Sequence, residues 1–263
     1  MKLTIRVADP AGNITILVKT PVKKEAYASL AGKLLTLIDG AEQVGFLTLP
    51  RHGGDVRLAM MGGEFCGNAL RSAALFYGVE QGSCGETRVM TEISGVNKPL
   101  PVLIDVEKNT AVAAMPLPKR IVPIAFGGGE GDAVFFDGIL HVVTDQAFAA
   151  DSPAVSRKYL QEISAWYQAA AAGLMFYEAK TATLTPVVYV AATNTLFYEN
   201  SCASGSAAVA AVLAQKGAAG SHLFRFREPG GVLEATAEKR DGEISSLCIG
   251  GKITLSHEKE VEI

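Results

Sequence analysis

Apolar residues along the chain follow two spacings, and the order in which the spacings occur repeats once. A stripe of apolar residues every three or four positions from Lys23 to Ile38 predicts a helix that ends at Asp39-Gly40. A run of Ala and Leu after Cys66, as far as Phe76, predicts a second helix. Short segments of alternating or continuous apolar residues predict strands around these helices. The strands lie near residues 3–7, 14–18, 43–49, 56–61, 87–93, 100–106 and 110–115.

The second half of the chain has the same order of elements. It starts after the proline-containing segment Met115-Pro116-Leu117-Pro118, contains a helical stripe at about 154–170, and has a second Ala/Val/Leu run after Cys202. The pattern predicts an α+β fold of two pseudo-symmetric domains, 1–117 and 118–263, with the functional site in a cleft between them. Packing of the last strand on the first domain is an alternative for the end of the chain. The strands predicted for this half lie near residues 121–126, 133–143, 174–178, 185–191, 195–198, 223–227, 232–239, 243–249 and 252–255.

Each predicted domain carries a cysteine at the start of its Ala-rich helix. Cys66 precedes Gly67-Asn68, and Cys202 precedes Ala203-Ser204. The positive end of a helix dipole favours a thiolate over a thiol, and the free N–H groups of a first helical turn can hold a carboxylate. A single buried cysteine is usually a packing residue. Two cysteines with matched flanking residues are better explained by chemistry.

Composition and charge narrow the class of protein. The net charge of −3 provides no basic surface for nucleic acid or an anionic membrane, and no apolar run is long enough to cross a bilayer. The first residues alternate like a strand and lack the apolar core of a signal peptide, so a cytoplasmic protein is expected. The four cysteines form no CxxC pair and the four histidines are scattered, so no metal site is expected.

Two facing thiols suit a proton transfer at carbon. One base, as a thiolate, removes a proton from one face of the carbon, and the other, as a thiol, returns a proton to the opposite face. The helix N-termini around Gly67, Asn68, Ala203 and Ser204 would hold the substrate carboxylate and stabilise the charge that develops on it. No motif for pyridoxal phosphate, flavin or nicotinamide is present. The sequence therefore predicts a cofactor-independent amino-acid racemase or epimerase.

At these residues the chain resembles the diaminopimelate epimerase superfamily, whose members carry Cys-Gly-Asn in the first domain and Cys-Gly-Ser/Thr in the second. The resemblance extends over the whole length and implies two domains, each a curved, mostly antiparallel sheet around a central helix, often assembled as a homodimer. It implies that Asn13 and Gln43 contact the amino-acid head of the substrate. It also implies that the Glu199-Asn200 segment holds the amino group.

Three departures separate the chain from diaminopimelate epimerases. Gly138-Ile139-Leu140-His141 stands where they carry Gly-Asn-Pro-His, Arg57 replaces an asparagine, and Cys202 follows Glu199 after a shorter link. The missing groups grip the second amino-acid end of diaminopimelate. Within the superfamily the chain is most similar to the histidine racemases of opine-type metallophore synthesis. The shared segments include Gly12–Val18, Glu42–Phe46, Glu64–Ala69, Glu199–Cys202 and Pro229-Gly230-Gly231, and Ala203 departs from the usual glycine.

The sequence thus predicts interconversion of L- and D-histidine, with Cys66 and Cys202 as the two bases and no cofactor. Diaminopimelate epimerase or a racemase of another amino acid is the alternative in the same class. A cysteine-dependent hydrolase using His141 or His52 is an alternative of a different class. A non-catalytic amino-acid-binding protein is another. Cys84 and Cys248 are assigned to packing or to surface loops.

Overall fold

The structure is a computed structural model that describes residues 1–126, 129–149, 152–191 and 194–263. It divides into two compact units, one of residues 1–114 with 250–263 and the other of residues 115–249. The chain therefore leaves the first unit once and returns to it near its end. Strand β16 (Glu243–Lys252) carries the chain from the second unit back into the first.

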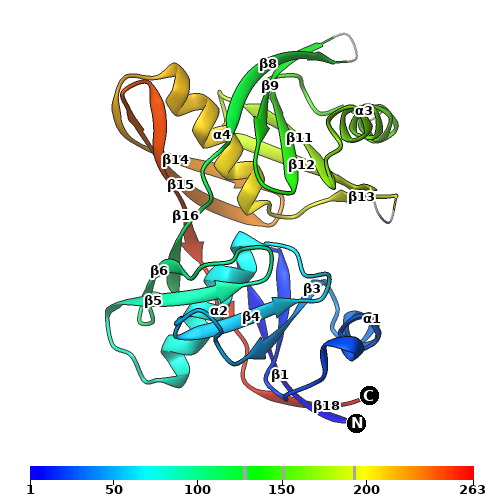
Figure 1. Cartoon of the computed structure of the whole chain (residues 1–263), viewed down its shortest axis with the longest axis vertical. Helices are drawn as coiled ribbons and strands as arrows, with labels where there is room; N and C mark the ends of the chain where they lie inside the picture. The colour runs from blue at the N-terminus through cyan, green and yellow to red at the C-terminus, as the bar shows by residue number, and fades with distance from the viewer. Residues whose placement is uncertain (127–128, 150–151, 192–193) are drawn as a thin grey trace. The chain divides into compact units, whose positions relative to one another are not determined.

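Each unit is an α+β assembly dominated by strands (Figure 1). In the first unit each of the strands β1 to β7 pairs with the next one along the chain. The pairs β2–β3 and β4–β5 are parallel, and the pairs β1–β2, β3–β4, β5–β6 and β6–β7 are antiparallel. Its elements are β1 (Lys2–Asp9), β2 (Ile14–Val18), α1 (Tyr27–Leu37), β3 (Ala41–Thr48), β4 (Val56–Met60), α2 (Gly67–Glu80), β5 (Glu86–Ile93), β6 (Leu100–Asp105), β7 (Thr110–Ala114), β17 (Thr254–Leu255) and β18 (Lys259–Glu262), with a 3₁₀ turn at Lys24–Ala26.

The second unit repeats this pairing order. β9 pairs with β10 antiparallel, β10 with β11 parallel, β11 with β12 antiparallel, β12 with β14 parallel, and β14 with β15 antiparallel. β8 and β13 are added at β9 and β12, both antiparallel. The elements are β8 (Arg120–Phe126), β9 (Gly129–Phe135), β10 (Ile139–Thr144), α3 (Ser152–Tyr167), β11 (Ala171–Glu178), β12 (Thr183–Val190), β13 (Thr195–Tyr198), α4 (Ala203–Lys216), β14 (Gly220–Glu228) and β15 (Gly231–Arg240).

Helices α2 and α4 are the central helices of their units (Figure 1). Most residues of each are buried, and most of those residues are small. Small side chains let the strands approach the helix backbone closely. At Gly78 of α2, for example, an added Cβ would lie 2.1 Å from Cδ1 of Ile104 on β6. The Ala-rich runs of the sequence are therefore the helices that form the centres of the two units.

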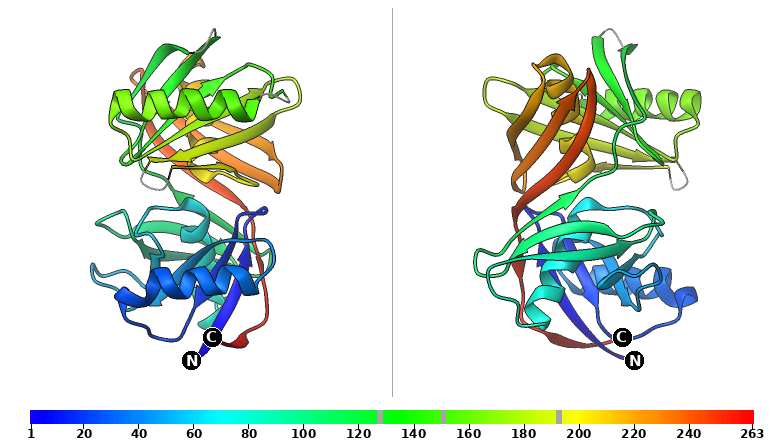
Figure 2. Two further views of the ribbon diagram at one scale, coloured as in Figure 1. Left: turned by 90° about the vertical axis from the view of Figure 1, so that its right-hand side faces the viewer. Right: turned by 60° about the vertical axis from the view of Figure 1, so that its left-hand side comes forward.

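Helices α1 and α3 pack on the sheets through separate apolar clusters (Figure 2). Tyr27 of α1 stacks on Phe46 of β3 with ring centroids 3.8 Å apart. Leu160 and Ile163 of α3 are buried among residues of β10 and β11. Each unit thus has one helix enclosed by strands and a second helix that covers another part of its sheet.

The single strand predicted near 133–143 is wrong, because the chain turns within it. Phe136 N–H donates to the carbonyl of Ile139 at 3.0 Å, and Gly138 has a φ of +80°, which a residue with a side chain rarely adopts. The apolar residues on both sides of Asp137-Gly138 belong to two antiparallel strands, β9 and β10.

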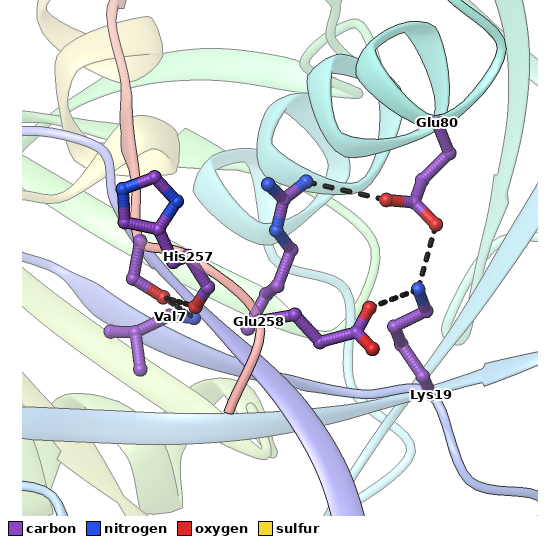
Figure 3. Close-up of polar contacts among 7 residues, drawn as sticks. Val7, Lys19, Glu80, His257 and Glu258 are labelled. Atoms are coloured by element: carbon purple, nitrogen blue, oxygen red, sulfur yellow. Dashed lines mark hydrogen bonds and ion pairs between the residues drawn. The ribbon is translucent and has the colours of Figure 1, made fainter. Parts of the chain in front are cut away.

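The end of the chain is bound to the first unit by strand pairing and by charge. β18 pairs antiparallel with β1, with Lys2 opposite Glu262 and Ile5 opposite Lys259. Lys19 Nζ contacts Glu80 of α2 at 2.7 Å and also pairs with Glu258 (Figure 3).

Among the described residues, no helix has the length and hydropathy that a membrane crossing needs.

Candidate active site

Cys66 occupies the N-cap position of α2. Its backbone is extended, with φ −136° and ψ 116°, and its Sγ accepts a hydrogen bond from Ala69 N–H at 3.4 Å. A side chain that accepts from the first helical turn lies in the positive field of the helix, which favours negative charge on the sulfur. The predicted helix start at Cys66 is confirmed.

Two predicted head-group residues converge on the sulfur of Cys66. Gln43 Nε2 on β3 lies 3.3 Å from Cys66 Sγ, and the thiol is 3.8 Å from Asn13 Oδ1 in the turn before β2. Gln43 also donates to Asn13 Oδ1 at 2.8 Å, and Asn13 Nδ2 donates to Glu42 Oε2 at 2.6 Å. The group offers Cys66 an amide donor when it is a thiolate and a carbonyl acceptor when it is a thiol.

Asn68 lies in the first turn of α2 and is 1% exposed. Its Oδ1 accepts from the guanidinium of Arg71 at 2.8 Å, and the same guanidinium donates to the carbonyls of Ala111 and Gly251, each at 3.3 Å. Arg71 is fully buried. A buried cation therefore lies near the start of α2 and fixes the orientation of the Asn68 amide.

Cys202 is the N-cap of α4 in the same local conformation as Cys66. Its φ and ψ are −122° and 100°, and its Sγ accepts from Gly205 N–H at 3.3 Å. Gly205 has no room for a side chain, because an added Cβ would lie 2.2 Å from Sδ of Met175 on β11. The sequence match between the two cysteine loops is thus a match of backbone structure.

Ser204 links Cys202 to the buried histidine of β10. Its hydroxyl lies 3.6 Å from Cys202 Sγ and 2.9 Å from His141 Nε2. Burial of His141 lowers the pKa of its imidazole to about 3, so the ring is neutral at physiological pH. His141 therefore contacts the hydroxyl of Ser204, and that hydroxyl lies beside the sulfur of Cys202.

Carboxylates surround Cys202. Burial, followed by the charges of Glu199 and Glu228, raises the pKa of its thiol well above the ordinary value, whereas the Ser204 hydroxyl lowers that pKa. Glu228, at the end of β14, accepts from Cys202 N–H at 2.5 Å and from the hydroxyl of Ser206. Burial and the charges of Glu199 and Glu228 thus act against ionisation of Cys202, in the direction opposite to the field of α4.

The structure thus brings Asn13, Gln43 and Asn68 together with Cys66 in the first unit. In the second unit it brings Glu199 and Ser204 to Cys202. Gly67 and Ala203 are the first residues of α2 and α4, and the carbonyl of Asn200 accepts from Gly230 N–H at 2.8 Å. Glu42, Arg71, Ser206 and Glu228 are contacts that the sequence analysis missed. Within the described ranges, no group of three or more His, Cys, Asp or Glu residues could hold a metal ion.

A signal for two of these missed residues is present in the sequence. Glu228 has the same strand phase as His222, Phe224 and buried Phe226, which places an acid on the inward face of β14. Arg71 interrupts the small and apolar run of α2. A charged residue in a buried phase marks a site where the charge has partners.

Known proteins are similar to this chain over nearly its whole length. A family model described as the histidine racemase CntK N-terminal domain matches residues 3–261. A histidine racemase of Staphylococcus aureus (strain Mu50) is 26% identical over 254 residues, which cover 94% of this chain and 92% of the relative. A histidine racemase of Fusobacterium nucleatum subsp. nucleatum (strain ATCC 25586) is 30% identical over 260 residues, which cover 92% and 93% of the two chains.

Solved structures share the fold. A probable proline racemase from Agrobacterium radiobacter K84 has a TM-score of 0.70 at 15% identity and covers 99% of this chain and 93% of its own. A protein described as a predicted epimerase from Pseudomonas aeruginosa has a TM-score of 0.70 at 13% identity and covers both chains completely. The α+β architecture expected from the sequence is confirmed by these neighbours.

Proposed function

The chain belongs to the histidine racemase family, and from that premise we propose that it interconverts L- and D-histidine by a two-base mechanism without a cofactor. The observation that carries the proposal is the pair of matched cysteines. Each one caps the central helix of its own unit with the same backbone conformation and the same N–H to sulfur contact. Packing alone does not require a thiol at two equivalent N-caps.

In the proposed reaction one cysteine, as a thiolate, removes the α-proton while the other, as a thiol, gives a proton to the opposite face of the α-carbon. The first cysteine then carries the removed proton and the second is left as the thiolate, so protons and charge balance over one turnover. The mechanism requires both sulfur atoms to reach one α-carbon. We propose that the two predicted domains, with residues 250–263 belonging to the first, close on the substrate to meet this requirement.

The groups beside the cysteines support binding of an amino-acid head. The N-terminal N–H groups of α2 and α4, at Gly67-Asn68 and Ala203-Ser204, suit a carboxylate. The carboxylate of Glu199, with the amide side chains of Asn13 and Gln43, suits an ammonium group and its orientation. Asn200 contributes through the segment that it shares with Glu199. The charge that builds up on the carboxylate in the transition state would be stabilised by the same N–H groups.

Two residues that differ from those of diaminopimelate epimerases favour histidine over diaminopimelate as the substrate. Arg57 stands where diaminopimelate epimerases have an asparagine, and its guanidinium is engaged with Thr48 at 2.6 Å and Glu92 at 3.7 Å. Ile139 stands at the asparagine of their Gly-Asn-Pro-His segment. Neither side chain provides an amide for a second amino-acid head. The hydrolase alternative is disfavoured because His141 contacts Ser204 instead of a cysteine and resists protonation.

The proposal is tested by incubating the protein with L-histidine in D₂O under reducing conditions with no added cofactor. Two monoprotic bases place a solvent deuteron on the product, whereas the proton removed from the substrate stays on the first sulfur. We therefore expect early D-histidine to carry deuterium at the α-carbon while the remaining L-histidine keeps its proton. Chiral chromatography with mass spectrometry measures both. Cys66→Ser and Cys202→Ser are each expected to lower the rate by about a thousandfold or more.

Cys84→Ser is the matched control, because Cys84 is exposed and takes no part in either cysteine loop. Its rate should equal that of the wild type. Equal deuteration of L- and D-histidine at early times would contradict the two-base mechanism. Absence of exchange into histidine, diaminopimelate and a panel of other amino acids would favour a non-catalytic binding protein. The family resemblance also leads us to propose a cytoplasmic protein that forms a homodimer. Sedimentation of the purified protein tests the homodimer.

A further inference from the structure

The carboxylate of Glu228 is built into the loop that presents Cys202. Glu228 is 7% exposed, and its two oxygens accept from the backbone N–H of Cys202 at 2.5 Å and from the hydroxyl of Ser206. The turn after Glu228 also contacts this loop, because Gly230 N–H donates to the carbonyl of Asn200 at 2.8 Å. The last residue of β14 and the turn that follows it therefore hold Asn200, Cys202 and Ser206 in place.

The ionisable groups that the second unit, as far as it is described, places near the start of α4 come from three elements of the chain. Glu199 precedes Cys202 in the same loop, Glu228 approaches from β14, and His141 on β10 is neutral. The charged groups that contact α4 from β9 and β15 lie at its other end. Asp132 pairs with Lys216 at 2.7 Å, and Lys239 donates to the carbonyls of Gln215 and Gly217. Within the second unit, the described ionised groups beside the Cys202 sulfur are thus carboxylates.

Resting on the proposed two-thiol racemisation, we propose that Glu228 is a positioning residue that keeps Cys202 in the thiol form in the free enzyme. Cys202 then gives the proton and Cys66 removes one in the first turnover. A carboxylate that holds the Cys202 amide places a fixed negative charge close to the sulfur, and a second negative charge on that sulfur is disfavoured. Burial of Cys202 acts in the same direction.

Glu199 also opposes ionisation of Cys202, but its effect differs from that of Glu228 during turnover. The substrate ammonium, held by Glu199 in the proposed complex, would offset the charge of that carboxylate. In the proposed complex Glu228, bound to the Cys202 N–H and to the Ser206 hydroxyl, does not hold the ammonium group, so its charge remains when substrate binds. The bias from Glu228 therefore acts in the free enzyme and in the complex.

The first unit carries the opposite charge near its cysteine helix. The buried charged side chain that contacts the first turn of α2 is Arg71, through Asn68 Oδ1. A cation favours a thiolate and an anion favours a thiol. A carboxylate, Glu42, is also present in the first unit, where it accepts from Asn13 Nδ2 at 2.6 Å. The duplicated framework thus differs in its buried charges, with the Arg71 cation near the start of α2 and the Glu228 carboxylate at the start of α4. A reaction with one thiolate and one thiol needs an asymmetry of this kind.

The test is the pH dependence of alkylation by iodoacetamide, followed separately at each cysteine by digestion and mass spectrometry. Only the thiolate reacts, so the midpoint of each titration reports ionisation independently of access. In the wild type the midpoint for Cys202 should lie above that for exposed Cys84. Glu228→Gln keeps the size of the side chain and an acceptor for the Cys202 amide. We expect it to move the Cys202 midpoint to lower pH and to raise alkylation of Cys202 at fixed pH several-fold.

Glu234→Gln is the matched control, because Glu234 pairs with Arg225 on the exposed face of the same strand pair. It should leave all four midpoints unchanged, and Glu228→Gln should leave the Cys84 midpoint unchanged. The proposal is overturned if wild-type Cys202 titrates at or below Cys84, or if folded Glu228→Gln leaves the Cys202 midpoint in place. The wild-type order of midpoints can overturn the proposal by itself, even if Glu228→Gln fails to fold. None of these readings depends on histidine turnover.

A kinetic reading separates this role from a structural one. The equilibrium constant of a racemisation is one, so kcat/KM is the same for L- and D-histidine. A free enzyme that prefers Cys202 as the thiol therefore shows different KM values for the two enantiomers, and the two kcat values differ by the same factor. Glu228→Gln should change the ratio of the two KM values several-fold. A loss of rate with an unchanged KM ratio would indicate a structural role only.

Discussion

At the scale of single residues, His141 is a buried ring with one hydrogen-bonded nitrogen. Nε2 lies 2.9 Å from Ser204 Oγ, whereas Nδ1 is buried without a partner among the described residues. Gly173 on β11 leaves the space that Nδ1 occupies, because a Cβ there would lie 2.4 Å from it. An unpaired buried N–H is rarer than an unpaired acceptor, which favours the tautomer with the hydrogen on Nε2. That tautomer directs the hydroxyl proton of Ser204 away from His141 and towards Cys202.

The low pKa of His141 makes stability depend on pH. The unfolded chain takes up a proton at this residue below about pH 6.5, whereas the folded chain does so only near pH 3, so acid favours unfolding. The stabilisation is therefore fully present above pH 6.5 and is lost as the pH falls. Between pH 7 and pH 5 the wild type should lose about 2 kcal/mol more unfolding free energy than His141→Gln. Urea denaturation at the two pH values measures this difference.

His52→Gln is the control, because His52 is exposed. It should follow the wild type at both pH values. An identical pH dependence for the wild type and His141→Gln would show that the folded protein accommodates a charged imidazole at this position.

The two cysteines could be predicted from the sequence because a helix start leaves a local signal, in which a polar turn precedes an Ala-rich run. Glu228 and Arg71 could not be assigned in the same way. Their roles depend on which amide or carbonyl lies opposite them after folding, and Glu228 is 26 positions from the Cys202 amide that it accepts from. Which of the two cysteines is harder to ionise could not be predicted for the same reason, since the helix field is local whereas burial and the Glu228 charge arise from tertiary structure.

At the scale of elements, the central helices differ from the covering helices in how closely they are packed. A Cβ added at Gly32 of α1 would meet no neighbouring atom within 4 Å, whereas one added at Gly78 of α2 would lie 2.1 Å from fully buried Ile104. The helical periodicity of both segments could be read from the sequence. Which of them is surrounded by strands depends on the pairing of distant strands, and the sequence pattern does not contain that information.

This difference predicts opposite effects of one substitution. Gly32→Ala should stabilise the protein by about 0.5–1 kcal/mol, because alanine loses less backbone entropy in a helix. Gly78→Ala gains the same term but forces Ile104 to move within a packed core, which typically costs about 1–3 kcal/mol. Thermal denaturation should show a higher Tm for the first variant and a lower Tm for the second. An equal rise for both would mean that the core beside α2 can yield.

At the scale of the whole molecule, the first unit is built from both ends of the chain. β17 and β18 pair with β1, and Ile253, which is 1% exposed, belongs to the apolar cluster that surrounds α2. The second unit is made of one continuous segment. The repeated element order could be predicted from the sequence, whereas packing of the last strand on the first domain is only an alternative there, because it depends on long-range pairing.

Ile253→Ala should therefore weaken the first unit selectively. Removing a buried Ile side chain typically costs about 2–5 kcal/mol. Hydrogen exchange resolved by peptide should show reduced protection in α2 and β5 and wild-type protection in α4. Leu160→Ala, in the cluster beneath α3, should give the reverse pattern. Equal loss of protection in both units from Ile253→Ala would show that they unfold as one cooperative body.

The contribution of the last residues to the first unit has a consequence for biosynthesis. A ribosome that has completed β7 must still add about 150 residues before β18 is available, which at roughly 5–20 residues per second takes between several seconds and about half a minute. Until then one edge of β1 has no partner strand and can pair with other chains. The later-made second unit, being continuous, can finish folding first. The nascent chain thus completes its structure in the reverse of the order in which its halves are translated.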